Sequence, residues 1–315
     1  MAAARSHKAS AGVRYPRIVV KLGTNLLTGG TDRLDATTMG ALVDQVARLV
    51  QVGHEVVVVT SGAIAAGREE LKARLSEGGA RGRAAVPLRQ MLAAVGQSRL
   101  MQRYQELFAP HGISIAQTLL TKADLDDRAG YLNARNTLLG LLELGVVPIV
   151  NENDVVATDE IKEARFGDND NLSATVANLV DADLLAILTD TDGLYSADPR
   201  RDPAARLVPR VEVIDAAIEA LAGAAGSQRG IGGMATKIEA ARLATSSGVA
   251  VAIANGRAPD VLLRLARGEA VGTLFPPATS KLESRQRWLL SGLAALGTLA
   301  LDDGAVRALR EQGRS

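Results

Sequence analysis

The chain has 315 residues, enough for one large α/β domain with a small appendage, and hydrophobic residues make up 47% of it. Its 36 basic and 35 acidic side chains balance and its aromatic content is 3%, which argues against a nucleic-acid or membrane surface as partner. Cysteine is absent, which excludes thiol nucleophiles, disulfides and thiolate metal sites and makes a reducing cytoplasm the expected location.

Short runs rich in Val and Ile alternate along the chain with longer segments rich in Ala and Leu. This alternation predicts a three-layer α/β fold around a mainly parallel sheet with helices on both faces. The expected strands are 17–21, 55–60, 113–117, 146–150, 184–189 and 249–254. The clearest expected helices are 37–51, 88–108 and 234–246.

The two ends of the chain differ in composition from the region between them. Residues 1–14 are basic and lack an apolar stretch, so we interpret them as a disordered extension, with an organelle transit peptide as the alternative. Residues 15–275 form the expected main α/β domain, and residues 276–286 are the expected linker. Residues 287–315 begin a second unit, which is too short to bury a core by itself.

Polar or glycine-containing residues follow each of four expected strands. They read KLGT at 21–24, SGA at 61–63, NEND at 151–154 and TDTDGLY at 189–195. Ligands of doubly wound sheets bind outside the carboxyl ends of the strands. The sequence therefore predicts a ligand site along this edge of the sheet.

Two of these strand ends could bind anions. Lys21, beside Gly23, could bind a phosphate, or it could be a strand-end lysine that reaches solvent. Ser61 could hold a carboxylate or phosphate with the N–H groups that follow it, or it could be an ordinary helix N-cap.

Acidic and amide side chains gather in two further segments. The residues at 151–154 could bind an ammonium group, although asparagine-rich turns are also common as structural features. In the segment FGDNDN, Asp168 and Asp170 would share a face of an extended chain but not of a helix start. Magnesium binding and a simple acidic turn both remain open for this segment.

A glycine-rich loop at 227–233 leads into the expected helix that contains Lys237. It lacks the preceding strand of a dinucleotide fingerprint, and Thr236 stands where a P-loop would have glycine. A nucleotide-phosphate site and a flexible connection remain as interpretations. His54 and His111 lie beside glycines before strands, which favours turn roles over catalytic ones.

Six motifs in order resemble those of the glutamate 5-kinases of the amino-acid-kinase family. They read VVKLGTNLLT, VVVTSGAIAAG, VPIVNENDVVA, FGDNDNLSA, LTDTDGLYSADPR and GIGGMATKIEAA, and they span roughly residues 17–273. The resemblance implies a three-layer α/β/α sandwich in which ATP and an acidic substrate meet at the carboxyl edge of the strands. It also makes residues 287–315 similar to the opening of a PUA domain that is incomplete here.

The resemblance assigns roles residue by residue. The catalytic set it implies is Lys21, Lys237 and Asp170, the acid being similar to one that holds both lysines. The ATP-binding set it implies is Lys21, Gly23, Thr189, Asp190, Ile231, Gly232, Gly233, Met234, Ala235, Thr236 and Lys237. The glutamate-binding set it implies is Ser61, Asn151, Asp154, Asp168 and Asn169.

The implied reaction suits these residue types. A glutamate side chain is ionised at neutral pH, so it needs no general base to act as a nucleophile. ATP and Mg²⁺ would serve the transfer, with the two lysines neutralising charge on the phosphoryl group. The resemblance further implies the first step of proline biosynthesis, feedback inhibition by proline, a homo-oligomer (dimer or tetramer) and functional coupling to glutamyl phosphate reductase.

Three alternatives remain at this point. Another member of the family would phosphorylate N-acetylglutamate, aspartate, carbamate or a nucleoside monophosphate, although the acids of NEND and GDNDN favour an acceptor with a free ammonium group. An RNA-binding protein is suggested by the PUA-like end and disfavoured by charge and aromatic content. A catalytically inactive amino-acid sensor is disfavoured because the key positions of the family are filled.

Overall fold

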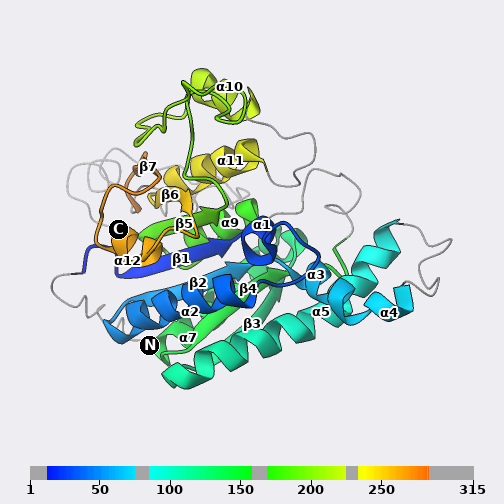
Figure 1. Cartoon of the computed structure of the whole chain (residues 1–315). Coiled ribbons are helices and arrows are strands. Elements are labelled where there is room, and N and C mark those ends of the chain that lie inside the picture. Colours follow the sequence, from blue (N-terminus) through cyan, green and yellow to red (C-terminus); the bar gives the residue numbers. More distant parts are fainter. Residues whose placement is uncertain (1–12, 76–84, 158–168, 225–232, 282, 284–315) are drawn as a thin grey trace, which may run out of the picture.

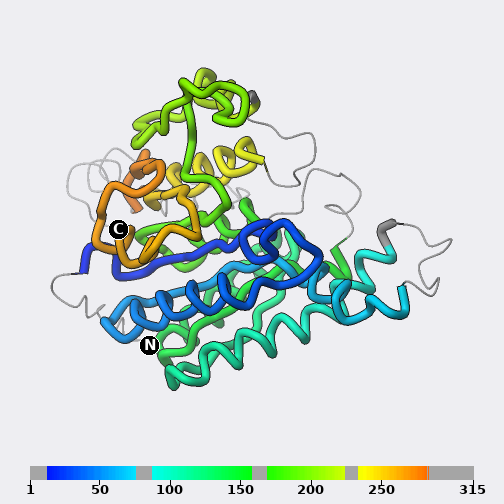
Figure 2. The backbone as a smooth tube through the Cα atoms, viewed as in Figure 1, coloured from blue at the N-terminus to red at the C-terminus, as the bar shows by residue number. Residues whose placement is uncertain are grey.

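The computed structural model has a central sheet between two layers of helices (Figure 1). It describes residues 13–75, 85–157, 169–224, 233–281 and 283. Seven strands follow the order β3-β4-β2-β1-β5-β6-β7, and all neighbours are parallel except β6 and β7. The first strand therefore lies in the middle of the sheet, as the blue tube in Figure 2 shows. The three-layer α/β fold predicted from the sequence is confirmed.

The strands begin and end close to where the sequence places them. They are β1 Arg17–Leu22, β2 Glu55–Thr60, β3 Ile115–Leu120, β4 Val147–Glu152, β5 Leu184–Thr189, β6 Ala250–Asn255 and β7 Thr273–Phe275. The prediction for β3 is too early, because Gly112 adopts a left-handed turn with φ of 67° and the chain needs two more residues to reach the sheet. The short antiparallel β7 was not predicted, because three residues show no usable periodicity.

Helices cover both faces of the sheet. In the described chain they are α1 Thr24–Thr28, α2 Ala36–Gln51, α3 Ala63–Glu70, α4 Lys72–Arg74, α5 Ala85–Phe108, the 3-10 helix η2 Ala109–His111, α6 Lys122–Asp126, α7 Arg128–Glu143, α9 Asp170–Leu179, α10 Ala216–Ala224, α11 Met234–Thr245 and α12 Val261–Ala266. None of these helices combines the length and the apolarity that a membrane span requires.

The core is divided into two clusters by the sheet, because successive side chains of a strand point to opposite faces. In β1, Ile18 and Val20 belong to the cluster under α2, α5 and α12, whereas Val19 belongs to the cluster under α7, α9 and α11. All six residues of β1 are buried. Lys21 lies two positions after Val19 and therefore faces α9 and α11.

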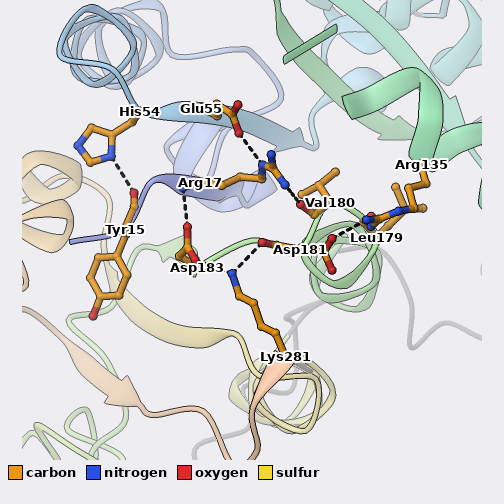
Figure 3. A network of polar contacts seen from close by, with 10 residues as sticks. All are labelled: Tyr15, Arg17, His54, Glu55, Arg135, Leu179, Val180, Asp181, Asp183 and Lys281. Atoms are coloured by element: carbon orange, nitrogen blue, oxygen red, sulfur yellow. Dashed lines mark hydrogen bonds and ion pairs between the residues drawn. The ribbon is translucent and has the colours of Figure 1, made fainter. Parts of the chain in front are cut away.

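Polar contacts fix the amino edge of the sheet, opposite the predicted ligand edge (Figure 3). Arg17 donates from Nε to Glu55 at 2.7 Å, and its backbone N–H donates to Asp183 at 2.7 Å. Lys281 reaches the Asp183 carboxylate at 2.5 Å, so described residues of the expected linker pack against the domain. His54 bonds the Tyr15 carbonyl at 2.8 Å, in keeping with a structural role.

Two glycines allow α3 and α5 to pack backbone against backbone. A Cβ atom on Gly67 would lie 1.9 Å from the Leu92 carbonyl oxygen, and one on Gly96 would lie 1.7 Å from the Ala63 carbonyl oxygen. Real atoms do not approach so closely, so each position requires glycine. The start of α3, directly after Ser61, is thus placed by its contact with α5.

We expect Gly96→Ala to lower the free energy of unfolding by about 1–3 kcal/mol, because the added methyl group forces the two helices apart. Urea denaturation would measure the change. The matched control is Gly140→Ala in α7, where an added Cβ meets nothing within 4 Å. That control should be neutral or stabilising by up to about 1 kcal/mol. Equal stability of the two variants would contradict the packing argument.

Candidate active site

Two lysines from distant parts of the chain meet at one carboxylate. The Lys21 ammonium group lies 2.7 Å from Oδ1 of Asp170, and the Lys237 ammonium group lies 3.2 Å from Oδ2. Lys21 comes from the central strand, Asp170 is the first residue of α9, and Lys237 lies in the first turn of α11. The structure therefore brings together the three residues to which the resemblance gives catalytic roles.

This cluster is shielded from solvent. Lys21 and Asp170 are 0% exposed and Lys237 is 3% exposed. Burial alone would raise the pKa of Asp170, but the ammonium groups of Lys21 and Lys237 outweigh it, and the pKa is lowered from its ordinary value. Asp170 is thus held as a carboxylate, and its place at the start of a helix adds a favourable dipole.

The structure excludes the purely structural alternative for Lys21 and for Ser61. Lys21 does not reach solvent, so it is no ordinary strand-end lysine. The N-cap of α3 is Gly62, with φ of 103°, so Ser61 is not the cap. Ser61 is 5% exposed, and within the described part of the chain its hydroxyl oxygen is buried without a hydrogen-bond partner. A buried hydroxyl of this kind is available to a ligand.

Amide side chains connect the ends of β2 and β4. Asn169 donates from Nδ2 to the Thr60 carbonyl at 2.5 Å and to Oδ1 of Asn151 at 2.7 Å. Asn151 in turn donates from Nδ2 to Oε1 of Gln97 at 2.8 Å. Asn151 and Asn169, both predicted from the sequence as substrate-binding residues, are therefore in direct contact, next to Ser61.

The remaining predicted substrate residues are less well defined. Asp154 lies half-buried in the turn after β4. Asp168 lies outside the described residues. The described part of FGDNDN settles one open question, because Asn169 is the N-cap of α9 and Asp170 begins the helix, so the segment is not extended at this point.

The predicted nucleotide residues that the structure describes lie at three places, the end of β5, the start of α11 and the start of α1. Thr189 ends β5 and is 8% exposed, and its hydroxyl donates to Asp190 at 3.1 Å. Gly233 is the N-cap of α11, which begins with Met234 and Ala235. Thr236 donates its hydroxyl to Asp170, at 2.8 Å, or to the Gly233 carbonyl at the same distance. Gly23 is the buried N-cap of α1, directly after β1. Ile231 and Gly232 lie outside the described residues.

Sequence reasoning missed two residues of α5. Gln97 bonds Asn151, and Tyr104, which is 0% exposed, bonds the Thr60 hydroxyl at 2.7 Å. Their spacing of seven residues places them on one helix face, a signal that was present in the sequence. What the sequence could not show is which strand ends that face meets.

Comparison with known proteins identifies the class of protein. Residues 16–255 match the amino acid kinase family, and the chain belongs to that family. A glutamate 5-kinase of Dehalococcoides mccartyi is 58% identical over 301 residues, covering 96% of this chain and 79% of that protein. A glutamate 5-kinase of Herpetosiphon aurantiacus is 56% identical with the same coverage of both chains. The resemblance seen in the sequence is confirmed.

A solved structure shares the fold at lower similarity. The UMP kinase of Bacillus anthracis aligns with a TM-score of 0.56 and 17% identity, covering 84% of this chain and 97% of that one. At this identity the likeness supports the fold alone. It agrees with the seven-stranded sheet described above.

We expect Asp170→Asn to lower the free energy of unfolding by about 3–5 kcal/mol at pH 7, because it removes the counterion shared by two buried ammonium groups. The lowered pKa means that ionised Asp170 stabilises the fold above the ordinary value of 3.8. That contribution to stability is lost as the pH falls through the lowered pKa of Asp170. The difference in unfolding free energy between Asp170→Asn and the unmodified protein should therefore become smaller in acid. Denaturant titrations between pH 7 and 3 would measure it.

The matched control is Asp126→Asn, which changes an exposed acid of α6. It should differ from the unmodified protein by at most about 0.5 kcal/mol. An Asp170→Asn variant as stable as this control would show that the buried ion pairs do not stabilise the fold.

Proposed function

We propose that the protein transfers the terminal phosphoryl group of ATP to the side-chain carboxylate of L-glutamate, giving γ-glutamyl phosphate and ADP. The observation on which this depends is the meeting of Lys21 and Lys237 at Asp170. The high identity to proteins named glutamate 5-kinase supports the choice of acceptor.

The chemistry requires alignment and charge neutralisation more than proton transfer. The acceptor carboxylate is already ionised at neutral pH, so it can attack phosphorus directly. The transferring phosphoryl group spreads negative charge over its oxygens, which preorganised cations stabilise. Lys21 and Lys237 supply two such cations, and Asp170 fixes where they lie.

The nucleotide would bind over β5 and the start of α11. We assign it to Lys21, Gly23, Thr189, Asp190 and residues 231–237, where backbone N–H groups at a helix start favour phosphate. In the described part of the chain no group of three or more acidic or histidine side chains could hold a metal. Mg²⁺ needs only one or two carboxylates when phosphates supply the other ligands. We therefore place Mg²⁺ with the phosphates of ATP.

The acceptor would bind between β2, β4 and the start of α9. We assign its carboxylates to Ser61, Asn151 and Asn169, and its ammonium group to Asp154 and Asp168. An acetylated amine would leave these two acids without a cation, which favours glutamate over N-acetylglutamate.

The assignment also places the protein in a reaction sequence. An acyl phosphate hydrolyses readily, so a reductase that consumes it, such as glutamyl phosphate reductase, is the expected functional partner. We propose that the enzyme acts in the cytoplasm at the first step of proline biosynthesis, as a homo-oligomer that proline inhibits.

We expect ADP release with ATP, Mg²⁺ and L-glutamate, measured by a coupled assay. N-acetylglutamate and L-aspartate should be much poorer acceptors, omission of Mg²⁺ should abolish turnover, and proline should inhibit it. A higher kcat/KM with either alternative acceptor would contradict the proposed substrate.

We expect Lys237→Ala to lower kcat roughly 100-fold to 1,000-fold, because one preorganised cation is lost from the transition state. Circular dichroism would establish that the variant is folded. The control is Arg267→Ala, an exposed cation at the end of α12 whose neighbour Gly268 lies against Arg14 at the opposite edge of the sheet, and this variant should keep full activity. An unchanged kcat would remove Lys237 from the mechanism.

A further inference from the structure

The direction of every hydrogen bond in the amide network follows from one backbone carbonyl. The Thr60 carbonyl oxygen can accept but not donate, so the side-chain atom of Asn169 that faces it must be Nδ2. The same Nδ2 lies 2.7 Å from Asn151, which must therefore present Oδ1. Asn151 is left with Nδ2 facing Gln97, at 2.8 Å. Gln97 must accept with Oε1.

Because these hydrogen-bond directions are fixed, the network ends at the amide nitrogen of Gln97. In the described part of the chain, Nε2 of Gln97 is buried and has no hydrogen-bond partner. A buried N–H group without an acceptor is unfavourable, and such groups in folded proteins usually have a role. The orientation that would exchange the two atoms of the Gln97 amide is excluded, because it would set two N–H groups against each other.

A second series of hydrogen bonds, which joins Tyr104, Thr60 and Ser61, lies next to the amide network. The Thr60 hydroxyl donates to the Ser61 carbonyl at 3.0 Å, so Tyr104 must donate its hydroxyl proton to Thr60. Burial raises the pKa of Tyr104, which keeps that proton in place. The Ser61 hydroxyl is likewise buried without a hydrogen-bond partner among the residues that the structure describes. Ser61 and Gln97 thus both offer a proton, which suits an anionic ligand.

The strand order indicates which part of the acceptor lies near Gln97. Asn151 is the last but one residue of β4, which is separated from β1 and Lys21 by β2. Two strand spacings amount to about 10 Å. The carboxylate that receives the phosphoryl group must lie at the Lys21 end. The Gln97 end is therefore left for the amino-acid end of the acceptor.

We propose that Gln97 is a further residue of the acceptor pocket, in which Oε1 orients Asn151 and Nε2 donates a hydrogen bond to the α-carboxylate of glutamate. This inference rests on the proposed function and adds a specificity-determining residue that the sequence motifs did not include. It explains why a helix outside those motifs contributes a buried amide to the site.

The variant Gln97→Glu separates the two roles. Its carboxylate can still accept the hydrogen bond from Asn151, but it offers no proton and repels the α-carboxylate. We expect the KM for L-glutamate to rise roughly 10-fold to 100-fold, with kcat changed less and the KM for ATP unchanged. Gln97→Met, which removes both roles, should also lower kcat because Asn151 loses its orientation.

L-isoglutamine, which carries an α-carboxamide and a free side-chain carboxylate, gives the sharper measurement. Its amide can donate to the carboxylate of the Gln97→Glu variant. The ratio of kcat/KM for glutamate to that for isoglutamine should therefore fall at least 10-fold, a change that a purely structural role would not produce. The matched controls are Gln102→Glu and Gln102→Met, at an exposed position on the same helix.

Two results would overturn the inference. One is an unchanged KM and acceptor ratio in Gln97→Glu, and the other is a Gln97→Met variant that binds glutamate normally by calorimetry. If Gln97→Glu does not fold, the calorimetric measurement on Gln97→Met tests the inference by itself. If the unmodified protein turns over glutamate but the Gln97 substitutions have no effect, only the role of Gln97 is refuted. An unmodified protein without glutamate-dependent turnover would refute the proposed function itself.

Discussion

The structure depends on a carboxylate that must offset two buried positive charges. Moving an ammonium group out of water is costly unless a partner of opposite charge lies close by, and Asp170 faces both Lys21 and Lys237. The three side chains together carry one net positive charge in a region shielded from solvent. Such a cluster is poised for an anion, and a phosphoryl group in transfer supplies one.

That requirement also determines how the chain is arranged. Lys21 lies in the central strand, and the helices that bear Asp170 and Lys237 pack on the same face of the sheet. The starts of α9 and α11 must therefore come to the carboxyl end of β1. The rest of the doubly wound sheet supports this meeting, and polar contacts at the opposite edge, around Arg17 and Asp183, fix the register of the strands.

The acceptor side depends on packing between helices. Gly67 and Gly96 let α3 approach α5 so closely that their backbones touch. The close approach places Ser61, just before α3, near the same helix that presents Gln97 and Tyr104. A methyl group at either glycine would alter the pocket without changing any polar residue in it.

Much of the fold followed from the sequence because the strands of a covered parallel sheet are nearly continuous apolar runs. The bounds of β2 and β5 were predicted to the residue, whereas β3 is half-exposed and was placed too early. Lys21, Asp170 and Lys237 could be selected by resemblance to a known family. Their contact could not be derived from spacing, because it depends on how helices far apart in the chain dock on one face.

The residues that sequence reasoning missed share a physical reason. Gln97 and Tyr104 lie within the long helix α5, and polar residues of helices are ordinary and usually face solvent. From the sequence alone, the glycines of the same helix likewise indicate only a weak propensity to form helix. Their importance appears when the helix is seen against the ends of β2 and β4. A motif identifies residues that touch a ligand at strand ends, but not side chains that reach the same place from a neighbouring element.

The two ends of the proposed pocket would bind the acceptor through different interactions. Together these interactions would restrict the length of the acceptor. In the proposed complex, charge would hold the transferring group beside Lys21, whereas directed hydrogen bonds from Ser61 and the amide network would hold the other end. The strands fix the distance between these ends, because neither β1 nor β4 can shift without breaking the sheet. An acceptor shorter by one methylene would sit about 1 Å from the reactive position, and a misplacement of that size can cost about 100-fold in rate. Under the proposed binding mode, the spacing of the sheet would therefore favour glutamate over aspartate.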